Sequence, residues 1–411
     1  MSIISRYQRA IKDFFYSFVA YMLPVAILQF AIQPILAGRL SDTENGLFLT
    51  LYSVVKLCVS VLVMPLTKVR LLHKQECAED ADKDKRFNYI FICIAAVSTL
   101  VSISFCILYS GKFDFFACVR LALVLLLVAA HDFIAIAYRV TLEYKKILIN
   151  NLLLTVGYAF GIGLFFLCGY WEIIFVSGYT VALGYVLLTT KFWRRGLAVR
   201  GSRALLPQYG DLTFSAALNN TTIYCDKMLI FPILGGALVS IYNAASVVSK
   251  IFSLISVPVR NVLLSYIVDK KALVLSKRSL RKITVLSVAC AALAYGCFYL
   301  ASVTLCRLLY PQYFDAAFKY IYIILIATLV ETCAGILNVI LLRFSSSRMQ
   351  IVFSLGKNIG YFAGIAVFVL LLRLELYGFC LAILTAELIY FTLIIWDFIR
   401  KMTIDDQKTS A

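Results

Sequence analysis

The sequence predicts an all-α, polytopic membrane protein with twelve transmembrane helices, and three observations support this class. Twelve apolar stretches of roughly 20 residues follow one another along the 411 residues, and this is the length that an α-helix needs to cross the hydrocarbon core. Charged residues make up 15% of the chain, whereas a soluble domain carries about 25%. The connections between the stretches are alternately basic and nearly free of charge.

Each predicted span is an apolar run that ends at a polar connection. The first run follows Arg6, Arg9 and Lys12, and no small-residue cleavage pattern comes after it, so we expect a retained first helix. The predicted spans cover residues 14–38, 44–66, 88–110, 115–138, 147–168, 172–191, 211–235, 238–267, 283–306, 316–342, 350–372 and 376–399.

The basic residues of the connections are distributed unevenly between the two sides of the membrane. One side, which includes both termini, carries 28 of them and the other side carries four. The positive-inside rule therefore predicts cytoplasmic termini. This anchoring explains most of the net charge of +17, so we expect no nucleic-acid partner.

Cysteine and histidine usage argues against a metal or disulfide framework. Most of the 12 cysteines lie in or at the ends of apolar spans, no Cys-x-x-Cys pair occurs, and the chain has only two histidines, His73 and His131. A Gly-rich phosphate loop is also missing from the sequence. We therefore expect no metal site, no cofactor and no ATP hydrolysis by this polypeptide.

An internal repeat relates the two halves of the sequence. Pro34-Ile35-Leu36-Ala37-Gly38 near the end of the first span matches Pro232-Ile233-Leu234-Gly235-Gly236 near the end of the seventh, and Lys56 then aligns with Lys250. Halves of six spans enter the membrane in the same sense. We therefore predict two six-helix bundles, 1–206 and 207–411, related by a pseudo-twofold axis along the membrane normal.

Five prolines interrupt the helices that carry this repeat. They allow bends at related places in the two halves, which suits alternating access by rocking of the bundles. The prolines are Pro24, Pro34, Pro65, Pro232 and Pro258.

Ionisable side chains at membrane depth are costly and usually face a protein interior or a wet cavity. Lys56, Lys250, Glu331 and Glu387 lie nearest the predicted midplane. Basic residues outnumber acidic ones within the spans, and a cavity of that sign favours an anionic passenger. Diphosphate groups suit Lys and Arg especially well.

Other charges have simpler expected roles. Arg120 and Lys357 lie within about seven residues of a span end, so we expect their side chains to reach the interface. For His131 beside Asp132 we expect a structural hydrogen bond rather than a proton relay.

Two motifs carry a family resemblance. Leu36-Ala37-Gly38 is followed by Glu44-x-Gly46-x-Phe48, and Asp226-Lys227-Met228-Leu229 is followed by Ile241-Tyr242-Asn243-Ala244-Ala245. With these motifs, the twelve spans and the short loops, the chain resembles the polysaccharide transporter family. This family comprises the O-antigen flippases of the multidrug/oligosaccharidyl-lipid/polysaccharide exporter superfamily.

The resemblance implies a function in polysaccharide biosynthesis. A flippase of this kind moves an undecaprenyl-diphosphate-linked oligosaccharide from the cytoplasmic to the periplasmic leaflet of the bacterial inner membrane. The transport would proceed by alternating access and be coupled to H⁺ or Na⁺. Whether the protein also assembles with a polysaccharide polymerase and a chain-length regulator is left open.

Site residues follow from the charge pattern and the resemblance together. We expect Lys56, Lys250 and Arg260 to meet the diphosphate or acidic sugars. Glu331 and Glu387 would balance charge or carry a coupling ion. The adjacent pair Asp226 and Lys227 would line the outer half of the path, with structural pairing to neighbouring helices left open as the alternative.

Three alternatives remain. A drug/cation antiporter of the same superfamily would use midplane acids, and the basic excess here disfavours it. A lipid II flippase commonly has helices beyond twelve. An O-antigen polymerase or ligase would need a sizeable outer loop, and since the outer connections are short we expect no enzyme.

Overall fold

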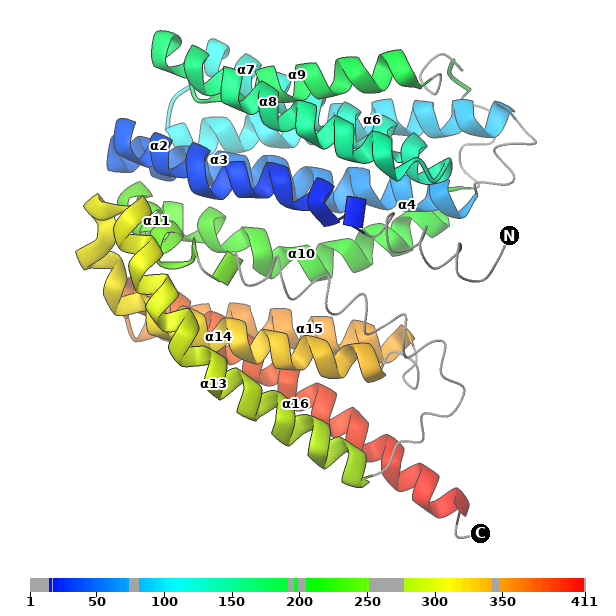
Figure 1. Cartoon of the computed structure of the whole chain (residues 1–411), viewed down its shortest axis with the longest axis vertical. Helices are drawn as coiled ribbons and strands as arrows, with labels where there is room; N and C mark the ends of the chain where they lie inside the picture. The colour runs from blue at the N-terminus through cyan, green and yellow to red at the C-terminus, as the bar shows by residue number, and fades with distance from the viewer. Residues whose placement is uncertain are drawn as a thin grey trace. The chain divides into compact units, whose positions relative to one another are not determined.

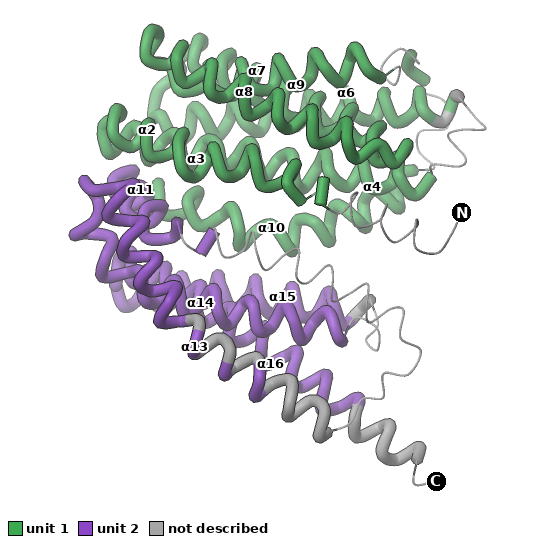
Figure 2. Tube along the Cα trace, in the orientation of Figure 1, with its two compact units in different colours: residues 1–232 green, residues 233–411 purple. Residues whose placement is uncertain are grey.

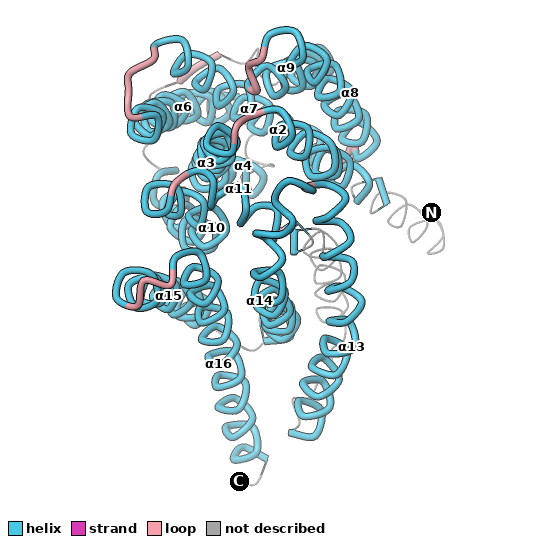
Figure 3. The backbone as a smooth tube through the Cα atoms, turned by 90° about the vertical axis from the view of Figure 1, so that its left-hand side faces the viewer, coloured by secondary structure: helices cyan, strands magenta, loops and turns pink. Residues whose placement is uncertain are grey.

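The computed structural model describes residues 15–16, 18–73, 81–190, 196–198, 205–247, 249–250, 277–341 and 347–409. Within these ranges the chain folds into helices and contains no β-strand (Figures 1 and 3). Nine helical segments of the described part are long and apolar enough to cross a membrane. The predicted class, an all-α polytopic membrane protein, is confirmed.

The helices follow the predicted spans closely. The first seven predicted spans overlap α2 (Gln33–Arg39), α3 (Asp42–Cys58), α4 (Met64–Leu72), α6 (Ala81–Ser110), α7 (Phe115–Val140), α8 (Tyr144–Cys168), α9 (Glu172–Thr189) and α10 (Leu206–Leu234), some of which extend beyond the predicted ends. The remaining helices are α11 (Gly236–Ala245), α13 (Lys277–Leu309), α14 (Phe314–Leu341), α15 (Ser347–Gly364) and α16 (Glu375–Thr409). Most of the predicted eighth span, 238–267, lies outside the described residues.

The chain divides into two compact units, residues 1–232 and residues 233–411 (Figure 2). Helix α10 belongs almost entirely to the first unit, to which side-chain hydrogen bonds tie both of its ends. The Tyr209 hydroxyl donates to the Leu62 carbonyl at 2.9 Å, and the Tyr109 hydroxyl of α6 donates to the Met228 carbonyl at 2.9 Å. The two predicted six-helix bundles, with a boundary at residue 206, stay a prediction.

Irregular helix geometry occurs at two of the five prolines that were predicted to interrupt helices. Pro34 and Pro65 are the second residues of α2 and α4, and each follows a π-helical segment, Leu28–Ile32 or Val59–Val63. A wider turn accommodates the i→i−4 hydrogen bond that proline cannot donate. Pro258 lies outside the described residues.

Helices α8 and α9 pack with their backbones in contact. A Cβ atom added at Gly161 would lie 2.6 Å from the Ile174 Cα, and one added at Gly157 would lie 2.8 Å from the Gly178 Cα. Small residues allow membrane helices to approach this closely, which strengthens their van der Waals packing. This contact fixes the position of Tyr158, which is next to Gly157, and of Tyr179, which is next to Gly178.

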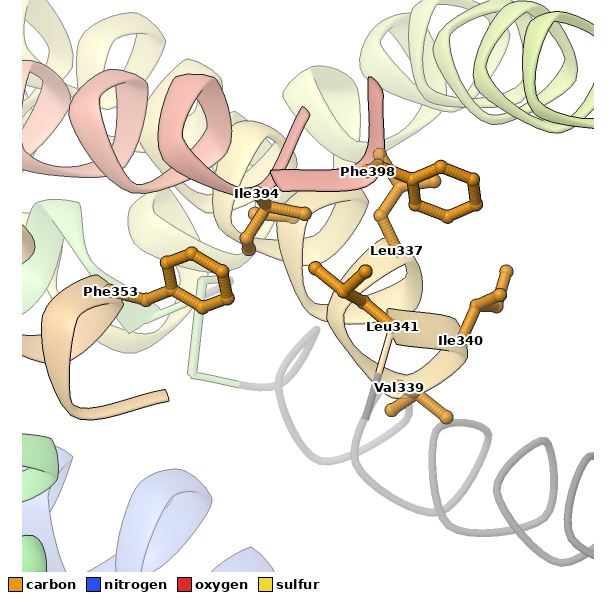
Figure 4. Close-up of a cluster of buried hydrophobic side chains, with 8 residues drawn as sticks. Leu337, Val339, Ile340, Leu341, Phe353, Ile394 and Phe398 are labelled. Carbon is orange, nitrogen blue, oxygen red and sulfur yellow. The ribbon is translucent and has the colours of Figure 1, made fainter. Parts of the chain in front are cut away.

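Helices α15 and α16 of the second unit also approach each other closely at glycine residues. A Cβ at Gly360 would lie 2.5 Å from the Ile389 Cδ1, and one at Gly364 would lie 2.9 Å from the Ala382 Cα. Beside this contact, α14, α15 and α16 share an apolar cluster, in which Phe353 and Ile394 are fully buried (Figure 4). These three helices are therefore held as one packed group.

Candidate functional site

Lys56 lies in the middle of the apolar segment Asp42–Leu72, which includes α3 and α4. Its Nζ donates a hydrogen bond to the Tyr179 hydroxyl of α9 at 3.2 Å. The same ammonium lies 5.5 Å from the ring centre of Tyr52 and 5.7 Å from that of Tyr179, within cation–π range. Lys56 forms no ion pair with any carboxylate that the structure describes.

Aromatic side chains from α3, α8 and α9 surround this lysine. The Tyr52 ring stacks on Phe175 with 4.6 Å between centroids, and Tyr158 makes edge contacts with Phe175 and Tyr179. All four rings are buried. We call Tyr52, Tyr158, Phe175 and Tyr179 the aromatic shell of Lys56.

The sequence analysis did not single out the aromatic shell. The available signal was the depth of its tyrosines, because Tyr52, Tyr158 and Tyr179 lie well inside their spans instead of at the membrane interface, where tyrosine is usually enriched. A tyrosine hydroxyl that is buried in a membrane needs a polar partner, and for Tyr179 this partner is Lys56.

A chain of polar side chains adjoins the aromatic shell. Asn150 Nδ2 lies 2.7 Å from His131 Nε2, and His131 Nδ1 lies 2.9 Å from an Asp132 carboxylate oxygen. The amide donates, so Nε2 accepts and the ring proton on Nδ1 is donated to Asp132, as a neutral imidazole allows. The expected hydrogen bond between His131 and Asp132 is present.

This polar chain includes a carboxylate, that of Asp132, whose negative charge acts on Lys56. Asp132 interacts electrostatically with the ammonium without an ion pair between them. The His131 ring also packs edge-on against Tyr179 at 5.3 Å, which links the polar chain to the shell. The carboxylate therefore compensates part of the lysine charge from outside its contact shell.

Helix α10 brings Asp226 and Lys227 into the same unit as Lys56. The Asp226 carboxylate is buried and accepts the backbone N–H of Lys227 at 2.7 Å. Neither side chain forms an ion pair with a described residue. Tyr224, three residues before Lys227, interacts electrostatically with Lys56, so α10 borders the same region.

The other predicted cationic residues belong to the second unit. The Lys250 Nζ donates a hydrogen bond to the side-chain oxygen of Asn243, which lies seven residues earlier in α11. Arg260 lies outside the described residues. The structure thus places the repeat-related lysines Lys56 and Lys250 in different units.

Glu331 and Glu387, the two acidic residues that the sequence analysis assigned to charge balance or ion coupling, interact with a different lysine. Lys357 of α15 forms an ion pair with Glu387 of α16, with 2.6 Å between Nζ and Oε1. Glu331 of α14 interacts electrostatically with the same ammonium. The expectation that Lys357 reaches the interface is wrong, because a buried carboxylate on the neighbouring helix holds its side chain inside the protein.

Arg120 also has a partner within the first unit. Its Nε lies 3.2 Å from a Glu172 carboxylate oxygen, and its guanidinium lies 4.2 Å from the ring centre of Tyr170. The expected position of this side chain near the span end is compatible with the pair, because Glu172 begins α9. The described residues contain no cluster of His, Cys, Asp or Glu that could hold a metal ion.

These charges lie within helices that define a multi-pass membrane protein, and its fold is that of known transporters. The inward closed lipid II flippase MurJ aligns with a TM-score of 0.68 at 12% identity, over 95% of this chain and 90% of that chain. An inward-facing multidrug resistance MATE family transporter of the MOP superfamily aligns with a TM-score of 0.65 at 11% identity, over 96% and 100%.

A eukaryotic MATE transporter, AtDTX14, aligns with a TM-score of 0.56 at 10% identity, over 98% of this chain and 99% of that chain. No protein-family model and no curated protein sequence matches. The chain therefore has the fold of these transporters, whose names include both a lipid II flippase and multidrug resistance transporters.

Proposed function

We propose that this protein is a flippase that moves an undecaprenyl-diphosphate-linked oligosaccharide from the cytoplasmic to the periplasmic leaflet of a bacterial inner membrane. The single observation that carries this proposal is Lys56, an ammonium at mid-membrane depth whose described contacts are neutral tyrosines. A cation left in this state attracts an anionic group strongly, because little water screens it there.

The chemistry around Lys56 suits a diphosphate joined to sugars. The ammonium is a compact point charge that can bind phosphate oxygens. The tyrosines of the aromatic shell combine apolar ring faces with hydroxyl groups, and both kinds of surface contact a sugar favourably. Asp132, held by His131, limits the cost of keeping the ammonium charged before the substrate arrives.

The other predicted residues have places in the same scheme. Lys227 and Asp226 on α10 would line the outer half of the path, and Lys250 and Arg260 would meet the diphosphate or acidic sugars during transit. Glu331 and Glu387 would balance charge or take part in ion coupling. Both termini would face the cytoplasm, and a polysaccharide polymerase and a chain-length regulator would be protein partners.

The MurJ neighbour is a lipid II flippase by name, which supports a lipid-linked cargo, whereas the MATE neighbours support a drug antiporter as the competing function. The positive charge of Lys56 favours the lipid-linked cargo over the drug. A cationic drug would be repelled by an ammonium that forms no ion pair with a carboxylate in the described part of the chain.

The test uses the native host from which this gene has been deleted. The strain is complemented with wild type, Lys56→Met or Lys68→Met at matched protein levels, and surface glycan and the lipid-linked repeat unit are quantified. Lys68 is the matched control, because it belongs to the same apolar segment but is exposed near its end.

We expect deletion to abolish long surface glycan and to accumulate the lipid-linked unit on the cytoplasmic side. Lys68→Met should restore export, while Lys56→Met should reduce it by about tenfold or more, equivalent to a loss of ~1.4 kcal/mol in binding of the anionic group. Normal glycan in the deletion strain, together with altered sensitivity to cationic drugs, would support the antiporter instead.

A further inference from the structure

His131 of α7 makes polar contacts through both nitrogens of its ring. Nδ1 lies 2.9 Å from an Asp132 carboxylate oxygen, and Nε2 lies 2.7 Å from Nδ2 of Asn150 on α8. The bond to Asp132 was expected from the sequence, whereas the contact with another helix was not. His131 and Asn150 are 5% and 2% exposed, so water competes little for the ring nitrogens.

The Asn150 side chain has an unused acceptor beside this ring. Its Oδ1 is buried and has no hydrogen-bond partner among the residues that the structure describes. A buried acceptor without a partner is costly, so such groups usually serve a second purpose. A half turn of the amide exchanges Oδ1 with Nδ2, and the oxygen then takes the position from which the nitrogen now donates to His131.

The two orientations of the amide suit the two protonation states of His131. The neutral ring has one donor and one acceptor, so Nδ1 donates to Asp132 while Nε2 accepts from Asn150. The imidazolium has two donors. When a proton from water adds to the Nε2 lone pair, the turned amide accepts it through Oδ1, Nδ1–H stays on Asp132, and no other bond changes.

Asp132 connects this buried ring to water and supplies its counter-charge. The Asp132 side chain is 27% exposed, whereas that of His131 is 7% exposed. A carboxylate at membrane depth usually faces a wet interior instead of lipid, so its exposed part offers a route for a proton. A carboxylate at 2.9 Å also favours the charged form of the ring.

Tyr179 connects the same ring to Lys56. The Tyr179 hydroxyl accepts from the Lys56 ammonium at 3.2 Å, and the Tyr179 ring packs edge-on against His131 with 5.3 Å between ring centres. The lysine and the histidine therefore contact one tyrosine side chain. Charges this close influence each other strongly where water is scarce.

We propose that His131 is a proton-binding site, completed by Asn150 and Asp132, that sets the affinity of Lys56 for an anionic group. While the ring is neutral, the Asp132 carboxylate compensates the ammonium. Protonation pairs that carboxylate with the imidazolium, so the three groups together change from neutral to positive. A proton at His131 and an anion at Lys56 therefore bind together, and each raises the affinity for the other.

Co-binding of this kind differs from proton antiport. Exchange of a proton for the cargo requires that the two compete for the protein, whereas here each favours the other. The His131 site would thus strengthen binding of the cargo on the more acidic side of the membrane. Only the anion in this inference rests on the proposed function, because proton binding can be measured without any substrate.

The helices packed around His131 and Lys56 bring other titratable groups near them. The tyrosines Tyr52, Tyr158, Tyr179 and Tyr224 stay neutral where histidine titrates, because tyrosine loses its proton only near about pH 10. The charged groups are Lys56 of α3, Arg70 of α4, Asp84 of α6, and Asp132 and Arg139 of α7. Arg70 and Asp84 form an ion pair at 3.0 Å, so together they add no net charge.

The test follows the protonation of His131 directly. The chain has two histidines, so His73→Gln leaves His131 as the only one. The full-length protein with ring-¹⁵N histidine is reconstituted in liposomes, and ¹⁵N solid-state NMR distinguishes the neutral ring from the imidazolium as the pH is changed. We expect the ring to titrate between about pH 5 and pH 8.

Two substitutions in this single-histidine background test the surroundings of the ring. Lys56→Met should raise the midpoint of the titration by about one pH unit, because it removes a nearby positive charge. Asn150→Leu should lower the midpoint, because the imidazolium loses its acceptor and charge-assisted hydrogen bonds are the stronger ones.

Sulfate tests the anion, since its charge is constant near neutral pH. It should raise the midpoint relative to chloride at equal ionic strength. Lys56→Met should abolish this response, and Lys68→Met, at an exposed position of the same apolar segment, should keep it.

Two results would overturn the inference. The first is a ring that keeps one protonation state throughout this pH range, and the second is a midpoint that Lys56→Met leaves unchanged. A midpoint that responds to Lys56→Met but not to sulfate would instead uphold the proton site and contradict anion binding at Lys56, which is a failure of the proposed function. The two failures are therefore distinguishable without any measurement of glycan export.

Discussion

Lys56 of the first unit and Lys357 of the second are both lysines at membrane depth, but their surroundings differ. Lys56 donates to a tyrosine hydroxyl at 3.2 Å and lies among aromatic rings, with Asp132 acting from a greater distance. Lys357 contacts the Glu387 carboxylate directly at 2.6 Å. The charge of Lys56 is thus only partly compensated, by Asp132 at a distance, whereas the charge of Lys357 is neutralised by an ion pair with Glu387.

We propose that this difference separates a lysine that binds substrate, Lys56, from a lysine with a structural role, Lys357. A paired ammonium has little attraction left for a ligand, and its removal leaves the partner carboxylate buried without compensation. A lysine among tyrosines keeps its attraction for an anion, and its removal relieves an unfavourable burial. Stability measurements on matched variants can therefore test the comparison without knowledge of the substrate.

The largest effect is expected for Glu387→Gln, which leaves the Lys357 ammonium without its contacting carboxylate. We expect a loss of about 3–5 kcal/mol in the free energy of unfolding, because breaking a buried ion pair leaves one uncompensated charge. Denaturant unfolding of the purified protein measures this loss. The double variant Lys357→Met/Glu387→Gln should recover most of it, and a stable single variant would contradict the assigned pair.

The next effect concerns the helix contact that positions the aromatic shell. Gly161→Ala should lower the free energy of unfolding by roughly 1–3 kcal/mol, because the new methyl group meets the backbone of Ile174. Gly163→Ala is the control, since the added methyl group there meets open space. That variant should be unchanged or more stable by less than about 1 kcal/mol. Equal effects of the two substitutions would contradict the close α8–α9 contact.

A smaller effect is expected for Tyr179→Phe, which removes only the hydroxyl that accepts from Lys56. The free energy of unfolding should fall by about 1–2 kcal/mol, because the hydroxyl takes part in hydrogen bonds with both Lys56 and Tyr158 and each is worth about 1 kcal/mol net. Tyr170→Phe, at an exposed position one residue before Trp171, should change it by less than about 0.5 kcal/mol. A loss of several kcal/mol for Tyr179→Phe would indicate that the hydroxyl contributes more to the stability of the aromatic shell than its hydrogen bonds account for.

The smallest effect on stability is expected for Lys56→Met, although the same variant should impair export most clearly. Its free energy of unfolding should change by less than about 1 kcal/mol, because the lost interactions and the relieved burial of charge offset one another. Lys357→Met in the same assay should lose about 3–5 kcal/mol. If the two methionine variants lose equal stability, the two lysines do not differ in the way that their contacts indicate.

The regular parts of the fold were predictable because they depend on local sequence. The predicted spans 115–138 and 172–191 correspond to α7 (Phe115–Val140) and α9 (Glu172–Thr189). A membrane helix satisfies its backbone hydrogen bonds within one segment, so apolar length and the polar residues that bound it are sufficient to locate it. The interruption of the helices at Pro34 and Pro65 was predictable as well, because proline cannot donate the backbone hydrogen bond, whereas the π-helical form of the turns before them was not predicted.

The partners of the charged side chains were not predictable in this way. Glu387 follows Lys357 by 30 residues and lies on another helix, and the contact depends on how α15 rotates against α16. Depth alone placed Lys357 near a span end and led to the wrong expectation that it reaches the interface. The glycines at this helix contact, such as Gly360, cannot be distinguished from other glycines by sequence. They differ only in the atoms of the neighbouring helix that lie against them.

The sequence by itself determined that this protein is a helical membrane protein and which charges lie deep within its spans, because hydrophobic length and residue position follow from local order. Only the tertiary structure decided that Lys56 faces tyrosines and that Lys357 faces a carboxylate. These facts depend on the faces that helices distant in the chain present to one another, and packing between helices fixes those faces.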